Sequence, residues 1–396
     1  IWDKIEADFK HAYDNLPETH SDAGRANKWA AGALLGKVYV FQAKWADAKS
    51  ILTTVINSGK TTNGKKYGLV PKFAEIFNAE NDNNEEAIFA MQSSMNTGST
   101  NNANGFDDLN YPYNTGADGP GNCCGFFQPT FSMANAYRTV GGLPILSEQA
   151  DGTPDYNLAA NAVKNDYGKN TTDAFVEDTD PLDPRIDHTI GRRGIQYLDW
   201  IEHPGANWIR SQVYAGPYSP KKYVYYKRQE NSLTDGSGWT RGYATMNFNI
   251  IRFADVLLLA AEAEIEAGSL TTALGYINQI RNRAANEAGF VTKGGKPEAN
   301  YQIKPYAAFA DKAEATKALR MERLLELATE GHRFFDLVRW GIASKTLNAY
   351  LKYESKFLVT KFGGSKYTTG KDEYLPIPQA QIDIQGAAVL KQNPGY

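Results

Sequence analysis

The chain has 396 residues, of which 42% are apolar and 22% are charged, and its formal net charge is -3. This composition is ordinary for a globular protein and excludes the disordered and collagen-like classes. The charge shows neither the basic footprint of a nucleic-acid-binding protein nor a polybasic run for an anionic membrane. We therefore expect a partner that is neutral, or one that is recognised locally.

Residues 1–58 predict three helices, because apolar residues recur there at helical spacing and Pro17 ends the first stripe. The second and third helices have the spacing of a tetratricopeptide pair, in which small residues allow two antiparallel helices to approach closely. The pair at 25–58 is matched by a second pair at 252–284 and by a more divergent one at 312–349. We therefore expect three helical hairpins that together bury a continuous core.

The run from Leu319 to Gly341, LRMERLLELATEGHRFFDLVRWG, predicts two packed helices with a tight corner at Gly331. Its charged residues stand three or four apart, which favours pairing along a helix. Glu330, His332 and Asp336 are also the residue types of an acid/base or metal cluster. Their spacing fits no metal-ligand pattern, so the preferred interpretation is that the charges are paired and stabilise the corner.

Residues 92–122 are rich in Asn, Gly, Ser and Thr and show no apolar period, so this segment is predicted to be a loop. Two interpretations stay open. The loop is either a solvated insertion, or a ligand-facing loop whose Asn and Asp side chains offer hydrogen-bond donors and acceptors to a ligand. In the second case, Asn104 and Asp107 are the candidate ligand-binding residues.

Aromatic residues make up 12% of the chain, with 23 Tyr and 7 Trp, and they concentrate between Trp200 and Trp239 in sequence rich in Pro, Gly and Ser. Tyr and Trp offer flat apolar faces for sugar rings together with a polar edge for hydroxyls. Some of these rings are expected in the core, and residues 219–230 alternate like a short strand. Trp200, Trp208, Tyr214 and Trp239 are the candidates for an exposed stacking platform.

The only two cysteines, Cys123 and Cys124, are neighbours in the sequence. This arrangement excludes a disulfide framework and the spacing of a metal site. Two states stay open for the pair. Ordinary disulfide geometry favours free thiols, whereas export to an oxidising compartment favours a vicinal disulfide.

The sequence has no convincing catalytic constellation, since it lacks G-x-S-x-G, a phosphate-binding glycine loop and H-E-x-x-H. The acidic pairs Asp107-Asp108 and Asp178-Asp180 would suit a glycosidase in principle, because that chemistry needs two carboxylates at a set separation. Acidic pairs are also common in loops. We therefore expect no enzyme, no catalytic residue, no cofactor and no metal ligand.

Three stretches in the same order resemble the SusD/RagB family of surface glycan-binding lipoproteins. They are ERLLELATEGHRFFDLVRWG, RFADVLLLAAEAEIEAG from Arg252 to Gly268, and YLPIPQAQIDIQGAAVLKQNPGY from Tyr374 to Tyr396. The stretch TDPLDPR also matches a family element, which we interpret as a turn fixed by Pro184. We expect Arg185 in that turn to pair with a nearby carboxylate.

The resemblance implies a mostly α fold, with tetratricopeptide-like hairpin repeats in a right-handed superhelical frame and a long loop-rich insert that carries a few short strands. In this single SusD-like unit, the N-terminal repeat helices would span 1–84, the ligand-binding insert 85–249, and the C-terminal repeat helices 250–350. The segment 351–396 should lie extended, because Pro376 and Pro378 disfavour a helix there.

The resemblance also implies a function. Such proteins capture oligo- or polysaccharide at the cell surface and deliver it to a SusC-like TonB-dependent transporter of the outer membrane. Their membrane attachment is an N-terminal lipid anchor, which we expect to lie outside this sequence. The rival interpretation, from a different class, is a helical-repeat scaffold that binds a protein partner without binding sugar.

Overall fold

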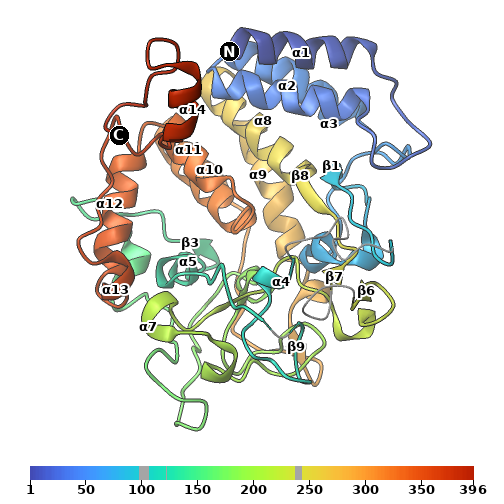
Figure 1. Cartoon of the computed structure of the whole chain (residues 1–396). Helices are drawn as coiled ribbons and strands as arrows, with labels where there is room; N and C mark the ends of the chain where they lie inside the picture. Colours follow the sequence, from blue (N-terminus) through green and yellow to red (C-terminus); the bar gives the residue numbers. More distant parts are fainter. Residues whose placement is uncertain (98–106, 122, 237–242) are drawn as a thin grey trace.

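A computed structural model describes residues 1–97, 107–121, 123–236 and 243–396 (Figure 1). The fold is mostly helical with a few short strands, as the sequence predicts. The α-helices, in chain order, are α1 (Trp2–Asn15), α2 (Lys28–Phe41), α3 (Trp45–Ser58), α4 (Asp107–Asn110), α5 (Phe131–Ala136), α6 (Ile186–Thr189), α7 (Gln212–Ala215), α8 (Phe253–Ala267), α9 (Leu270–Ala284), α10 (Lys312–Glu326), α11 (Arg333–Arg339), α12 (Ala343–Glu354), α13 (Val359–Phe362) and α14 (Gln379–Gln385).

The strands form two-stranded antiparallel sheets in the described residues. The longest pair joins β1 (Ala87–Met91) to β8 (Phe248–Arg252), which leads directly into α8. The shorter pairs are β2 (Thr139–Val140) with β3 (Leu143–Pro144), β4 (Ile190–Gly191) with β5 (Ser219–Pro220), β6 (Thr234–Asp235) with β7 (Tyr243–Ala244), and β9 (Thr292–Lys293) with β10 (Lys296–Pro297).

The long helices follow one another in an arc, and the segment between β1 and β8 fills the opposite side with loops and short elements (Figure 1). Helix α8 is the centre of the helical part, because nearly all of its side chains are buried and it packs against α2, α3, α9 and α10. A helix that is buried on nearly every side lies in the core, and the buried Asp255 and Glu262 of α8 are paired with Arg323 and Arg339. The predicted hairpins at 25–58 and 252–284 are observed as α2–α3 and α8–α9, while their right-handed superhelical arrangement stays a prediction.

Some of the helices begin at a residue whose side chain caps them, and α2 and α10 are examples. The Asn27 side chain accepts a hydrogen bond from the Ala30 backbone N–H at 2.8 Å, at the start of α2. At the start of α10, Asp311 accepts from Glu314 N at 2.8 Å, and the Glu314 carboxylate accepts from Ala310 N at 2.6 Å. These contacts satisfy backbone N–H groups that have no partner inside the helix.

The predicted corner at Gly331 is confirmed. Gly331 has a φ of +83° and connects the end of α10 to α11, and glycine adopts this left-handed backbone without strain. Arg323 Nε bonds Asp336 at 2.7 Å across the corner. Glu330 bonds Lys222 and Arg252 instead, so both Asp336 and Glu330 form structural ion pairs, as expected.

A buried ion-pair network joins the helical part to the loop-rich part. The Arg252 Nη1 atom lies 2.6 Å from Glu326 and 2.8 Å from Glu86. Arg185, the arginine of the predicted D-P-R turn, has no exposed surface and pairs with Asp183 at 2.7 Å and with Glu326 at 3.1 Å. The prediction of a paired Arg185 is therefore confirmed.

Two predicted details are wrong. The tail after residue 351 is not simply extended, because α12 continues to Glu354 and α13 and α14 follow. Pro378 is the N-cap of α14, a position next to the first helical turn where proline is tolerated. The strand expected at 219–230 is reduced to Ser219–Pro220, and its later residues form turns and a 3-10 helix at Lys227–Gln229. The division of the chain at residues 84, 249 and 350 stays a prediction.

Candidate functional site

Trp200 and Trp208 are buried, so the prediction of an exposed platform is wrong for both. Their exposed fractions are 6% and 3%. Trp200 Nε1 donates to the Tyr225 carbonyl at 3.1 Å, and Trp208 packs edge-on against Tyr197 with ring centroids 5.4 Å apart. The loop-rich part has few long helices to supply aliphatic side chains, and its core is built largely from aromatic rings.

The other predicted site residues have different outcomes. Tyr214 in α7 is 52% exposed, and Lys361 of α13 lies over its ring at 5.3 Å. Asp107 is the first residue of α4. Asn104 and Trp239 lie outside the described residues. The structure therefore brings Tyr214 to the surface, and the role of these four residues in ligand binding stays a prediction.

Exposed aromatic rings do occur beside the two cysteines. Tyr113 is 36% exposed and Phe126 is 46% exposed. The exposed Arg210 guanidinium lies 5.8 Å from the Tyr113 ring centroid and 5.1 Å from that of Phe126. Cations over aromatic faces at these distances are attracted to the rings. We call Tyr113, Phe126, Arg210, Cys123 and Cys124 the Arg210 surface.

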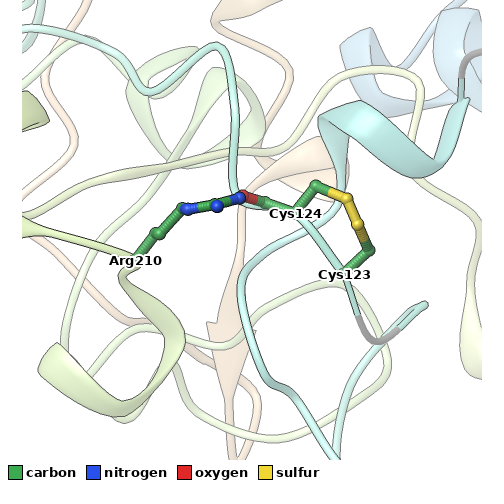
Figure 2. Close-up of a disulfide and its surroundings, with 3 residues drawn as sticks. All are labelled: Cys123, Cys124 and Arg210. Atoms are coloured by element: carbon green, nitrogen blue, oxygen red, sulfur yellow. A yellow bond between two sulfur atoms is a disulfide. The ribbon is translucent and has the colours of Figure 1, made fainter.

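Cys123 and Cys124 are joined by a disulfide, which settles the alternative left open by the sequence (Figure 2). Cys124 is buried and Cys123 is half-buried. The Cys124 carbonyl accepts a hydrogen bond from Arg210 Nη1 at 3.1 Å (Figure 2). A bond between neighbours closes a very short loop and removes little entropy from the unfolded chain. Its effect is therefore local, and it fixes the turn that carries Phe126.

Backbone hydrogen bonds hold the Arg210 surface in place. Gly125 N donates to Tyr111 O at 3.1 Å, and Tyr113 N donates to Trp208 O at 3.0 Å. Gly125 has a φ of +62°, and a Cβ atom at this position would lie 2.8 Å from the Tyr113 Cβ. Glycine is therefore required at 125, between the disulfide and the exposed Phe126 ring.

The sequence analysis did not single out Tyr113, Phe126 and Arg210. They lie in YPYN, CCGFF and WIR, where the local pattern does not distinguish an exposed ring from a buried one. One signal was available in the sequence. Tyr113 follows a proline, and Phe126 follows the two cysteines and a glycine, so both rings stand next to turn residues. Large rings next to turn residues have few neighbours along the chain that can cover them.

One of the acidic residues that the sequence analysis considered for a glycosidase has a structural partner. Asp178, one of the predicted acidic pairs, forms two hydrogen bonds with Arg138, at 2.9 and 2.6 Å. Burial would raise the pKa of Asp178, but its bonds with Arg138 overcome this and hold the pKa below the ordinary value. Burial raises the pKa of Asp82 to about 7, in part offset by a bond from the Asn247 backbone. Within the described residues, no three His, Cys, Asp or Glu side chains are grouped to hold a metal ion.

No helix in the described part of the chain is both long and apolar enough to cross a bilayer.

Comparison with known proteins identifies the class. The model of the SusD family matches residues 85–396, which is well over half of the chain. The chain therefore belongs to the SusD family. A SusD-like protein of Formosa agariphila is 26% identical over 404 aligned residues, which cover 100% of this chain and 64% of that protein.

Solved structures share the fold of this chain. A SusD superfamily protein from Bacteroides vulgatus has a TM-score of 0.62 at 24% identity, with 96% of this chain and 66% of that chain covered. A laminarin-binding SusD-like protein has a TM-score of 0.56 at 25% identity, with 100% of this chain and 68% of that chain covered. The chain spans just under two thirds of the length of the Formosa and Bacteroides vulgatus proteins.

Proposed function

We propose that this protein is a non-catalytic, surface-exposed glycan-binding lipoprotein of the outer membrane, which captures oligo- or polysaccharide through the Arg210 surface. The single observation that carries the site is the exposure of Tyr113 and Phe126 beside the Arg210 guanidinium. Membership of the SusD family and the likeness to a laminarin-binding protein support a carbohydrate as the ligand.

The chemistry of the Arg210 surface suits a sugar. The two rings offer apolar faces on which the C–H groups of a pyranose would stack. Arg210 has five N–H donors, of which one bonds the Cys124 carbonyl. The remaining donors would bond sugar hydroxyls, which need partners when a ligand displaces water. Such a site binds by contact and orientation, and it contains no group that would cleave a glycosidic bond.

We further propose that the captured glycan passes to a SusC-like TonB-dependent transporter. Family membership supports this step, because the SusD-like fold is that of nutrient-uptake proteins. The alternative, a scaffold that binds a protein partner without sugar, differs in one measurable property. In native affinity gels that contain single polysaccharides, a glycan-binding protein is retarded by at least one of them, whereas the scaffold is retarded by none.

The site is tested by replacing the two rings singly with alanine. Because each ring would supply a large apolar contact, Tyr113→Ala and Phe126→Ala should each weaken binding of the retarding glycan by about fivefold or more. Isothermal titration calorimetry with an oligosaccharide of that glycan measures the loss. The melting temperature should stay unchanged, since both rings are exposed.

Phe335 on α11 is the matched control, because it is a phenylalanine that is 58% exposed and lies outside the Arg210 surface. Phe335→Ala should bind as the wild type does. Equal losses from all three variants, or no loss from Tyr113→Ala and Phe126→Ala, would reject the Arg210 surface as the binding site. Release of shorter sugars from the glycan by the pure protein would reject the non-catalytic function.

A further inference from the structure

A second site is suggested by a cavity of about 300 Å³ between α5, α10, α11 and α12. In Figure 1, α5, α10, α11 and α12 lie in the left part of the view, whereas α1–α3 lie at the upper right. Much of the cavity wall is apolar, and it includes Met133, Leu324, Leu337 and Leu347. A cavity of this size and character fits a small molecule with one ring.

One cation on the cavity wall, Arg333, has no counter-charge in the described part of the chain. Arg333, the first residue of α11, lines the wall, and its Nη1 atom donates to the Arg320 carbonyl at 3.3 Å. Among the described residues, no carboxylate lies within ion-pair distance of Arg333. Asp336, one turn further along α11, bonds Arg323 at 2.7 Å and Arg339 at 2.8 Å. Burial lowers the pKa of Arg333, as expected for a cation that is partly desolvated.

Several polar groups on the same wall already have partners within the protein. Asn157 Nδ2 donates to Ser132 Oγ at 2.9 Å, and the Asn157 oxygen accepts from Asn135 Nδ2 at 3.0 Å. Gln128 Nε2 donates to two backbone carbonyls of the segment before β5, both at 3.1 Å. The Arg333 guanidinium lies over the Trp340 ring, 5.9 Å from its centroid. It still stands out on this wall, because its five N–H donors have a single hydrogen bond and no ion pair among the described residues.

The backbone around the cavity is also unusual. Two of its lining residues, Phe127 and Thr329, have φ values of +58° and +65°. Residues with a side chain adopt this left-handed region at a cost, and a β-branched residue such as threonine does so rarely. Strain of this kind persists where the surrounding structure fixes the chain, and it is often found at ligand sites.

We propose that this cavity binds a small monocarboxylate with an apolar ring. The carboxylate would take the two parallel N–H bonds that a guanidinium offers, and it would neutralise Arg333. The ring would lie among Met133, Leu324 and Leu347. A neutral sugar does not match this wall, because its hydroxyls would meet apolar side chains. The cavity is therefore a site for a ligand of a different class from the glycan of the Arg210 surface.

The probe for this proposal is 3-phenylpropionate, and the control ligand is its neutral amide, 3-phenylpropionamide. Calorimetric titration of the whole 396-residue protein should give a dissociation constant below about 10 mM for the acid. The amide has the same shape and lacks the charge, so its affinity should be weaker by about tenfold or more. No binding of the acid at this concentration, or equal affinity for acid and amide, would overturn the proposal.

Two variants test the assigned residues. Arg333→Gln should weaken binding of the acid by about tenfold, while Arg320→Gln, which removes a neighbouring cation outside the cavity wall, should change it less than about twofold. Leu347→Trp keeps Arg333 and should abolish binding by filling the cavity. Circular dichroism shows whether each variant is folded. Unchanged affinity in folded Arg333→Gln or Leu347→Trp would place the ligand elsewhere, and the comparison of acid with amide decides the proposal if both variants misfold.

Discussion

Glu354, at the end of α12, is the clearest case in which the surroundings of one residue change its chemistry. Its side chain has no exposed surface, and its Oε1 atom accepts a hydrogen bond from Ser132 N at 2.7 Å. Burial raises the pKa of Glu354 from 4.5 to about 7, although this backbone bond opposes the shift. At neutral pH the carboxyl group is therefore partly protonated in the folded protein and ionised in the unfolded chain.

This shift predicts a pH-dependent contribution to stability. Between pH 4.5 and 7 the folded state holds a proton that the unfolded state has released, so the contribution of Glu354 is full below pH 4.5 and is lost as the pH rises to about 7. Glu354→Gln cannot ionise. We expect its unfolding free energy, relative to the wild type, to rise by on the order of 1–3 kcal/mol from pH 4.5 to pH 8.

Urea unfolding at a series of pH values measures this difference. Any fixed cost of the amide cancels, because only the change with pH is compared. A difference between variant and wild type that is the same at pH 4.5 and pH 8 would show that Glu354 titrates normally. The same physics limits sequence analysis, since nothing in LKYESK distinguishes Glu354 from an exposed glutamate.

At the scale of elements, the close contact between α2 and α3 depends on glycine at position 36. A Cβ atom on Gly36 would lie 2.4 Å from Leu52 Cδ2, and Leu52 has no exposed surface. The small residue therefore sets the distance between the two helices, as the spacing of the predicted hairpin suggests. Gly275 in α9 provides a contrast, since a Cβ atom there would meet nothing within 4 Å.

Replacement of glycine by alanine should therefore change the unfolding free energy in opposite directions at positions 36 and 275. Gly36→Ala should lower the unfolding free energy by about 1–3 kcal/mol, because the buried Leu52 must shift to admit the methyl group. Gly275→Ala should raise it by about 0.5–1 kcal/mol, because alanine favours the helix. Thermal or urea unfolding of both variants measures the effects. Stabilisation by Gly36→Ala would show that α2 and α3 are not in close contact.

At the scale of the whole molecule, the buried ion pairs connect the helical part to the segment between β1 and β8. Glu326 of α10 accepts from Arg252, which ends β8, and it also pairs with Arg185 and Arg283. Burial by itself would raise the pKa of Glu326, but the three arginines overcome it and hold the pKa below the ordinary value. One carboxylate thus fixes three elements that are far apart in the sequence.

Removing this carboxylate should destabilise the molecule as a whole. Glu326→Gln leaves buried arginines without their full counter-charge, and we expect a loss of about 3–5 kcal/mol of unfolding free energy. Glu80→Gln is the control, because its pair with Arg228 is exposed and such pairs contribute about 0–1 kcal/mol. Urea unfolding that gave similar losses for the two variants would contradict a central role for the network.

The helical part and the aromatic segment differ in how far their structure could be predicted from the sequence. The helices at 25–58, 252–284 and 312–341 have a regular apolar period, and the corner at Gly331 follows from one glycine in that period. The aromatic segment has no period. Trp208 and Phe126 both lie beside turn residues, yet the first is 3% exposed and the second 46%. Their exposure depends on which distant segments cover them.

The sequence by itself determined the family and the long helices at 25–58, 252–284 and 312–341, because these depend on local spacing and on residue types that occur in a fixed order. The tertiary structure decided which aromatic rings are exposed, the disulfide between Cys123 and Cys124, and the lack of an ion pair at Arg333 among the described residues. Each of these depends on contacts between segments that lie far apart in the chain or on the conformation of a single turn. Burial and counter-charge are properties of the folded surroundings, and no local pattern of residues specifies them.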